Sequence, residues 1–190
     1  MIDVSSSARR APSAERLAGR CHMFMSVSLE DQAGRPFTNE RFKGHWSLVL
    51  IGFTHCPDVC PFTLENLALI IEQLSTRVSP ERLPQVVFLA ADPERDRPVL
   101  ANYVRHFNAD FVGITGSTEG IKTLVDGLGG YVRIAGKQAG GDGYQVYHSA
   151  VVSVIDAEAR IRATLNPPMD PLAAADFLCD LMRRSAREQK

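Results

Sequence analysis

The chain has 190 residues, of which 45% are hydrophobic and 23% are charged. This length and composition indicate one globular domain with a core of its own and exclude a disordered protein. The 21 lysines and arginines nearly balance the 22 aspartates and glutamates, so the net charge of −1 predicts no nucleic-acid partner. The 4 cysteines are too few for a small scaffold held together by disulfides.

The beginning of the chain is rich in serine, alanine and arginine and shows no clear hydrophobic periodicity. We expect a flexible N-terminal arm over residues 1–20 and a single domain over residues 21–190. The arm has no apolar segment of the kind found in secretory signals, and the best apolar run, residues 46–53, is far shorter than the roughly 20 residues that cross a membrane. On these grounds, either the protein is cytoplasmic or its sequence begins after a leader.

Short apolar or alternating runs, separated by turn-forming residues, predict a series of strands. The strands lie at residues 23–29, 47–53, 86–91, 111–114, 131–134, 144–147, 150–155 and 161–165. Helices are predicted after the loop 54–61, after the turn 92–98, and over residues 118–128 and 171–182. In the first of these helices, the side chains that share an apolar face are Leu64, Leu67, Ala68, Ile71 and Leu74.

The order of these elements indicates the fold class. Buried strands that alternate with helices, followed by a hairpin and a closing helix, predict an α/β domain with a mixed central sheet flanked by helices. The order fits a thioredoxin-like fold with an extra N-terminal strand and a β-hairpin insertion. The connection of that hairpin, residues 136–143, is rich in glycine and is expected to be a turn or a lid.

Two cysteines lie where a predicted buried strand is followed by a helix, which is where α/β sheets present their ligand sites. Cys56 and Cys60 are separated by three residues in the loop, and Pro61 suits the first turn of the helix. Cys60 should therefore lie near a helix N-terminus, whose partial positive charge favours the thiolate. Such a pair can form a disulfide, exchange disulfides or bind a metal; two buried structural cysteines are the alternative, and the spacing is not C-x-x-C.

Among the histidines, His148 is the best candidate for a third ligand, because it follows the glycine-rich connection and precedes an apolar strand. His55 ranks second: it is adjacent to Cys56, and neighbouring residues in an extended segment point to opposite sides. Two thiolates and one imidazole form a soft set that favours copper, as Cu(I) or Cu(II), since a structural zinc site takes four ligands and an iron–sulfur cluster takes four thiolates. Cys21 and Cys179 lie far from the pair in sequence and are expected to be bystanders.

The segment 52–61, Gly-Phe-Thr-His-Cys-Pro-Asp-Val-Cys-Pro, resembles the signature of the Sco/SenC family of copper-binding proteins. Two further segments, 92–96 and 144–149, resemble the family's acidic turn and its histidine-bearing segment, in the same order. The resemblance extends over residues 23–182 and implies a thioredoxin-like fold that binds one copper ion. The implied ligands are Cys56, Cys60 and His148.

The resemblance also implies a role for two carboxylates in the turn after the third predicted strand. Asp92 and Asp96 correspond to the family's acidic motif, which is associated with partner contact or with tuning of the site. From the residues alone, a purely structural role is an equally good interpretation: Asp92 starts a turn, and Asp96 caps the helix that follows.

The function implied by the resemblance is that of a copper metallochaperone for assembly of the binuclear copper centre of cytochrome c oxidase. Its partner would be the copper-accepting subunit of that enzyme or another copper protein. The alternative is a metal-free thiol–disulfide reductase in which Cys56 and Cys60 are a redox pair restored by an external reductant. A peroxidase and a redox or copper sensor are weaker alternatives.

The resemblance also bears on location and assembly. Family members usually carry an N-terminal membrane anchor, which implies the periplasmic side of the inner membrane. This sequence contains neither an anchor nor a signal peptide, so we expect a truncated or soluble form. We also expect a monomer.

Overall fold

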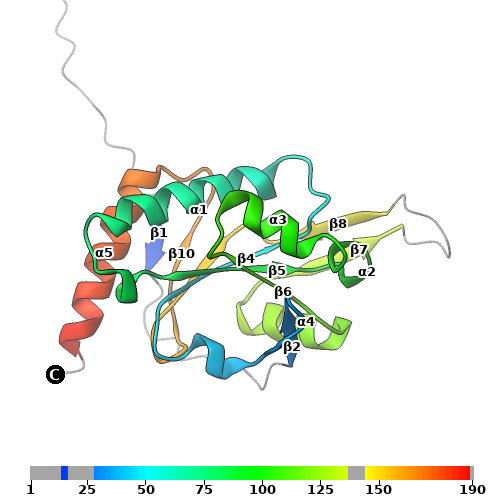
Figure 1. Cartoon of the computed structure of the whole chain (residues 1–190), viewed down its shortest axis with the longest axis horizontal. Helices are drawn as coiled ribbons and strands as arrows, with labels where there is room; N and C mark the ends of the chain where they lie inside the picture. The colour runs from blue at the N-terminus through cyan, green and yellow to red at the C-terminus, as the bar shows by residue number, and fades with distance from the viewer. Residues whose placement is uncertain (1–13, 17–27, 137–143, 189–190) are drawn as a thin grey trace, which may run out of the picture.

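A central mixed sheet organises the computed structural model, which describes residues 14–16, 28–136 and 144–188 (Figure 1). Within these residues the sheet has eight strands, in the order β1 (Ala14–Arg16), β10 (Ile161–Leu165), β9 (Val152–Ile155), β4 (Ser47–Gly52), β5 (Gln85–Ala90), β6 (Val112–Thr115), β2 (Leu29–Asp31) and β3 (Pro36–Phe37). β4, β5 and β6 are parallel to one another, and the remaining pairs are antiparallel. A separate antiparallel pair, β7 (Val132–Ala135) and β8 (Gln145–His148), forms the predicted hairpin insertion.

Helices cover both faces of this sheet (Figure 1). One face carries α1 (Val59–Ser75), α3 (Leu100–Phe107) and α5 (Pro171–Glu188). The other face carries α4 (Thr118–Gly127) and the β7–β8 hairpin. The short helix α2 (Pro93–Asp96) follows β5, and the described 3₁₀ turns are η1 (Asn39–Phe42) and η2 (Pro80–Arg82).

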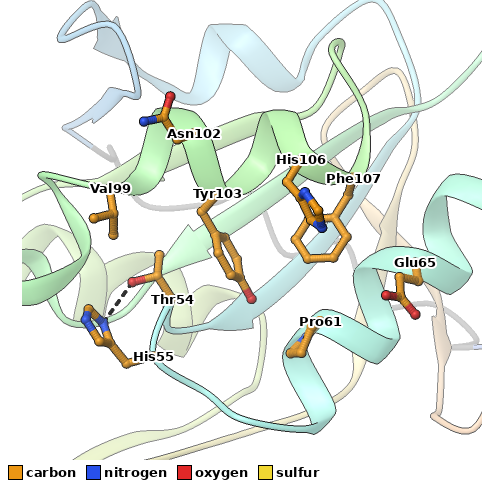
Figure 2. A pocket seen from close by; sticks show the side chains of 9 residues that line it. All are labelled: Thr54, His55, Pro61, Glu65, Val99, Asn102, Tyr103, His106 and Phe107. Atoms are coloured by element: carbon orange, nitrogen blue, oxygen red, sulfur yellow. Dashed lines mark hydrogen bonds between the residues drawn. The ribbon is translucent and has the colours of Figure 1, made fainter.

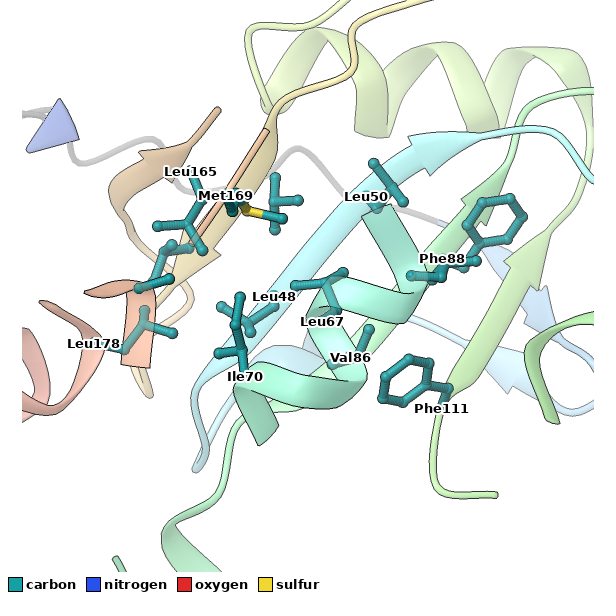
Figure 3. Close-up of a cluster of buried hydrophobic side chains, with 14 of the residues drawn as sticks. Leu48, Leu50, Leu67, Ile70, Val86, Phe88, Phe111, Leu165, Met169 and Leu178 are labelled. Carbon is teal, nitrogen blue, oxygen red and sulfur yellow. The ribbon is translucent and has the colours of Figure 1, made fainter. Parts of the chain in front are cut away.

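The central strand β4 is buried on both sides because helices lie over both faces of the sheet. Leu48 and Leu50 belong to the core beneath α1 and α5, whereas Val49 and Ile51 belong to the core beneath α4. Figure 3 shows the first of these cores, where α1 packs onto β4 and β5. The fully buried leucines and isoleucine of α1 are Leu64, Leu67, Ile70 and Leu74.

The predicted thioredoxin-like arrangement, a mixed sheet flanked by helices, is confirmed, with shifts in detail. Ile70 faces the core from α1, whereas Ile71 and Ala68 are only half-buried at the edge of that face. Because α1 packs against both the sheet and α5, it turns the row of side chains that contains Ile70 toward the core. The closing helix runs to Glu188, past its predicted end at residue 182, because Ser185 still lies on its buried face.

The N-terminal predictions fall largely outside the described residues. The only described part of the expected arm, Ala14–Arg16, pairs with β10, and the strand expected at residues 23–29 is described only from residue 28 onward, where β2 begins at Leu29. The division into an arm and one domain therefore remains a prediction. Among the described residues, no helix is both long enough and apolar enough to cross a membrane.

Candidate metal centre

The site lies at the carboxyl end of β4, where the chain leaves the sheet and enters α1. Gly52 ends the strand, and the space beside it is filled by other side chains. A Cβ at this position would lie 2.6 Å from Phe88 Cε2 and 2.9 Å from Cys60 Sγ. Glycine is therefore needed here because the Cys60 sulfur packs directly against the strand backbone.

Three soft ligand atoms meet at this point. Cys56 lies in the loop and is half-buried, whereas Cys60 is the second residue of α1 and is only 1% exposed. His148 arrives from the end of β8, and its Nε2 lies 3.4 Å from Cys60 Sγ. The two sulfurs and the imidazole nitrogen all lie within 4.8 Å of one another, and they are the one such group of three among the described residues.

The orientation of His148 follows from its second ring nitrogen. Nδ1 lies 3.0 Å from the carbonyl oxygen of Ser149, which can only accept a hydrogen bond, so Nδ1 carries the proton. In this tautomer of the imidazole, the lone pair of Nε2 points toward Cys60. A backbone carbonyl in this place is a usual partner for a metal-binding histidine, because it fixes both the tautomer and the ring orientation.

The protonation of Cys60 differs from the expectation based on its helical position. The prediction that Cys60 lies at a helix N-terminus is confirmed, but burial raises the pKa of its thiol. A backbone hydrogen bond from Phe53 opposes this effect, while the nearby Cys56 and Asp96 reinforce it. Burial is the largest of these effects, so the folded protein holds the Cys60 proton more tightly than a free thiol holds its own.

The carboxylate of Asp96 fastens the cysteine loop to the turn after β5. It is fully buried and accepts hydrogen bonds from Thr54 N at 2.8 Å, Thr54 Oγ1 at 2.7 Å and Asp92 N at 2.9 Å. Burial raises the pKa of Asp96, against the lowering effect of these three donors. The expectation that Asp96 caps the following helix is wrong, because α3 begins at Leu100 with no side-chain cap among the described residues.

Asp92 connects the same turn to the strand that bears His148. Its Oδ2 accepts from Tyr144 Oη at 2.8 Å and from Arg95 Nε at 2.6 Å, and the Arg95 guanidinium stacks 3.8 Å above the Tyr144 ring. Tyr144 immediately precedes β8. Asp92 is only 1% exposed and Asp96 is fully buried, so neither carboxylate is open to direct contact at the surface.

The other candidates lie apart from this group. His55 is exposed and lies outside the group of three, and Cys179 is buried in α5. Cys21 lies outside the described residues. Sequence reasoning assigned no role to Thr54 and Tyr144, although both stand within the segments that carry the family resemblance; only the fold shows that they bond to the two carboxylates.

Comparison with known proteins identifies the family of this chain. A family model described as SCO1/SenC matches residues 18–183. The chain belongs to the SCO1/SenC family. An SCO2-like protein of Rickettsia conorii is 35% identical to it over 152 residues, which make up 79% of this chain and 72% of the relative.

Solved structures of the SCO1/SenC family share the fold. Arabidopsis thaliana ScoI with copper bound is 28% identical, with a TM-score of 0.76 over 85% of this chain and 99% of that chain. Yeast Sco1 with copper bound is 29% identical, also with a TM-score of 0.76, over 82% of this chain and 86% of that chain. The resemblance to this family is thereby confirmed.

The donor set of this SCO1/SenC chain fits copper on chemical grounds. Thiolate sulfur and imidazole nitrogen are ligands that both Cu(I) and Cu(II) accept, and three of them leave a coordination position for an exchanging ligand. The described residues gather no four-thiolate set for an iron–sulfur cluster, and no fourth cysteine, histidine or carboxylate donor joins the group within 4.8 Å to make a closed zinc site.

Proposed function

We propose that this chain is a copper metallochaperone that binds one copper ion through Cys56, Cys60 and His148. The convergence of these three donors within 4.8 Å is the observation that carries the proposal. Copper is cargo in this function: it is taken up, held and passed on. The copper-bound structures of two SCO1/SenC relatives support this assignment.

The unequal exposure of the two sulfurs suits transfer. Cys60 is buried against Gly52, so an incoming protein has no direct access to it. Cys56 is half-buried in the loop and offers the sulfur at which an acceptor can begin ligand exchange. The proposed acceptor is the subunit of cytochrome c oxidase that carries the binuclear copper centre, or another copper protein with thiolate ligands.

The test is copper stoichiometry and the visible spectrum of the copper-loaded protein. Wild type should bind one copper per chain, and Cys56→Ser, Cys60→Ser and His148→Ala should each lose tight binding and the sulfur-to-Cu(II) absorption. Cys179→Ser is the matched control, since it removes a buried cysteine in α5 and should leave both readouts unchanged. A His148→Ala protein with wild-type Cu(II) affinity and spectrum would remove His148 from the site.

The second candidate function is a thiol–disulfide reductase, which the proximity of the two sulfurs favours. The Cys56 thiolate attacks a partner disulfide, and one partner thiolate leaves as a mixed disulfide forms. Cys60 then attacks Cys56 as its proton passes to the second partner thiolate, which leaves, and a Cys56–Cys60 disulfide remains. An external dithiol returns the two electrons. Turnover that is insensitive to a copper chelator and to His148→Ala would favour this function over the first.

Location and assembly complete the proposal. We place the protein on the periplasmic side of the inner membrane, where a bacterial oxidase receives copper, and we propose that it acts as a monomer. Relatives include the Rickettsia protein and the mitochondrial SCO2 of Saccharomyces cerevisiae. Fractionation of cells that express the full-length gene, together with light scattering of the purified protein, tests both statements.

A further inference from the structure

The residue that leads from β4 into the cysteine loop contacts all three proposed copper ligands. Phe53 follows Gly52 and is half-buried. Its carbonyl oxygen accepts a hydrogen bond from Cys56 N at 3.2 Å, and its backbone also hydrogen-bonds the Cys60 thiol. Its ring meets the His148 imidazole edge to face, with ring centroids 6.1 Å apart and ring planes at 77° to each other. Rings in this arrangement attract each other, so the Phe53 side chain favours one orientation of the imidazole.

The cysteine loop is packed unequally on its two sides. Thr54, the residue after Phe53, lines a cavity of about 560 Å³ beside α3, and the described residues around this cavity include none of the three ligands (Figure 2). Phe53 packs instead against the hydrophobic cluster beneath α4. Neighbouring residues of an extended segment point to opposite sides, which explains the difference. The contact with His148 is therefore made from the packed side of the loop.

The Phe53 ring is in turn contacted by Arg95. The guanidinium carbon of Arg95 lies 5.6 Å from the centre of the Phe53 ring and 3.8 Å from the centre of the Tyr144 ring. A planar guanidinium is attracted to aromatic faces, and Arg95 Nε is fixed by its hydrogen bond to Asp92 Oδ2 at 2.6 Å. Phe53 begins the cysteine loop and Tyr144 precedes the strand of His148, so one cation joins the two segments that meet at the metal centre.

We propose that Phe53 is a positioning residue that orients His148 for Cu(II), and that Arg95 holds the Phe53 ring in place. This inference rests on the proposed copper-carrier function. Soft thiolates select Cu(I), whereas Cu(II) favours nitrogen and oxygen donors, so the imidazole matters more to Cu(II). Loss of the Phe53 ring should therefore weaken the binding of Cu(II) and leave the binding of Cu(I) to the two sulfurs unchanged.

The experiment compares wild type with Phe53→Leu, which keeps an apolar side chain but removes the ring. Chelator competition gives the affinities for Cu(I) and Cu(II), and voltammetry gives the reduction potential of the bound ion. The Cu(II) affinity should fall by about three- to tenfold, as expected for the loss of one aromatic pair, with an equal Cu(I) affinity. A tenfold difference raises the potential of this one-electron couple by about 59 mV. Phe53→Tyr, which keeps the ring, should retain the wild-type potential.

Two arginine variants test the second part of the proposal. Arg95→Lys keeps a positive charge beside Asp92 but loses the planar group, so it should raise the potential by less than Phe53→Leu does, because the Phe53 ring remains. Arg133→Lys is the matched control. Arg133 lies 4.7 Å from the centre of the Tyr147 ring, so this variant makes the same exchange at another contact between an arginine and an aromatic ring. It should give the wild-type potential.

A second readout uses the metal-free protein. Nuclear Overhauser effects between the ring protons of Phe53 and His148 should be present in wild type and in Arg133→Lys, and weaker in Arg95→Lys. Their absence from wild type would overturn the contact itself. An unchanged potential in Phe53→Leu, or equal losses of Cu(I) and Cu(II) affinity, would overturn the positioning role alone. A wild-type protein that shows these effects but binds no copper overturns the proposed function.

Discussion

Replacing Tyr144 with phenylalanine tests whether the acidic turn stabilises the strand that carries His148. The Tyr144 hydroxyl donates to Asp92 Oδ2 across 2.8 Å, and both side chains are buried. A hydrogen bond to a charged group contributes about 1.5–3 kcal/mol, and Arg95 Nε continues to donate to the same carboxylate. We therefore expect Tyr144→Phe to lower the free energy of unfolding by about 1.5–2 kcal/mol, measured by urea denaturation of the metal-free protein near neutral pH.

The same variant should change the response to alkali. Burial and the hydrogen bond to Asp92 raise the pKa of Tyr144 from 10.0 to about 12. Because the folded state holds this proton more tightly than the unfolded state, the stabilisation is complete below pH 10.0 and is lost as the pH rises through about 12. Tyr144→Phe should flatten the fall in stability across that window. Some slope should remain, because burial also raises the pKa of Tyr103.

Tyr131→Phe is the matched control, since the Tyr131 side chain is 59% exposed. It should change the free energy of unfolding by less than about 0.5 kcal/mol and leave the alkaline response as in wild type. If Tyr144→Phe is as stable as Tyr131→Phe, the hydrogen bond to Asp92 does not stabilise the fold. An equal alkaline slope in wild type and Tyr144→Phe would refute the argument from the pKa of Tyr144.

Three further changes test the packing and redox state of the site. Gly52→Ala places a Cβ against Phe88 and the Cys60 sulfur, so it should lower the free energy of unfolding by about 1–3 kcal/mol and weaken copper binding. An unchanged copper affinity in chelator competition would contradict the expected effect on binding. Oxidation to a Cys56–Cys60 disulfide removes two ligands and should abolish Cu(I) binding in equilibrium dialysis. Tight binding by the oxidised protein would refute the argument that the same two cysteines serve as copper ligands and as a redox pair. The Tyr103 hydroxyl is buried with no hydrogen-bond partner among the described residues, so Tyr103→Phe should raise the free energy of unfolding by about 1 kcal/mol, and a fall in urea stability would show that the hydroxyl is satisfied.

The fold and the three donors were accessible from the sequence because their signals are local. A continuous apolar run predicted β4, since a strand covered on both faces is built mostly from apolar side chains. The position of Cys60 at the start of α1 followed from Pro61. Which side of α1 faces the core could not be predicted fully from the sequence. The choice between Ile70 and Ile71 depends on how the helix is rotated about its axis against the sheet and α5.

The roles of the acidic pair were not accessible for a different reason. A buried carboxylate is recognised by its donors, and these come from distant segments: Thr54 lies 42 residues before Asp96, and Tyr144 lies 52 residues after Asp92. The sequence shows an Asp-Pro turn at Asp92 and, in Asp96, a carboxylate that looks like the cap of the helix that follows. Only the parallel pairing of β4 with β5 brings the turn after one strand beside the loop after the other.

In the proposed function, this arrangement would hold the donors in place for copper. Asp96 fixes the cysteine loop, Asp92 fixes the start of β8, and the two carboxylates lie in one short turn, so both halves of the site are fastened to the same support. The Cys60 sulfur and His148 Nε2 lie 3.4 Å apart. Little conformational entropy is then lost when the ion binds, and the protein remains folded when the ion leaves. The proposed copper carrier, which would have to release its ion and remain folded, needs both properties.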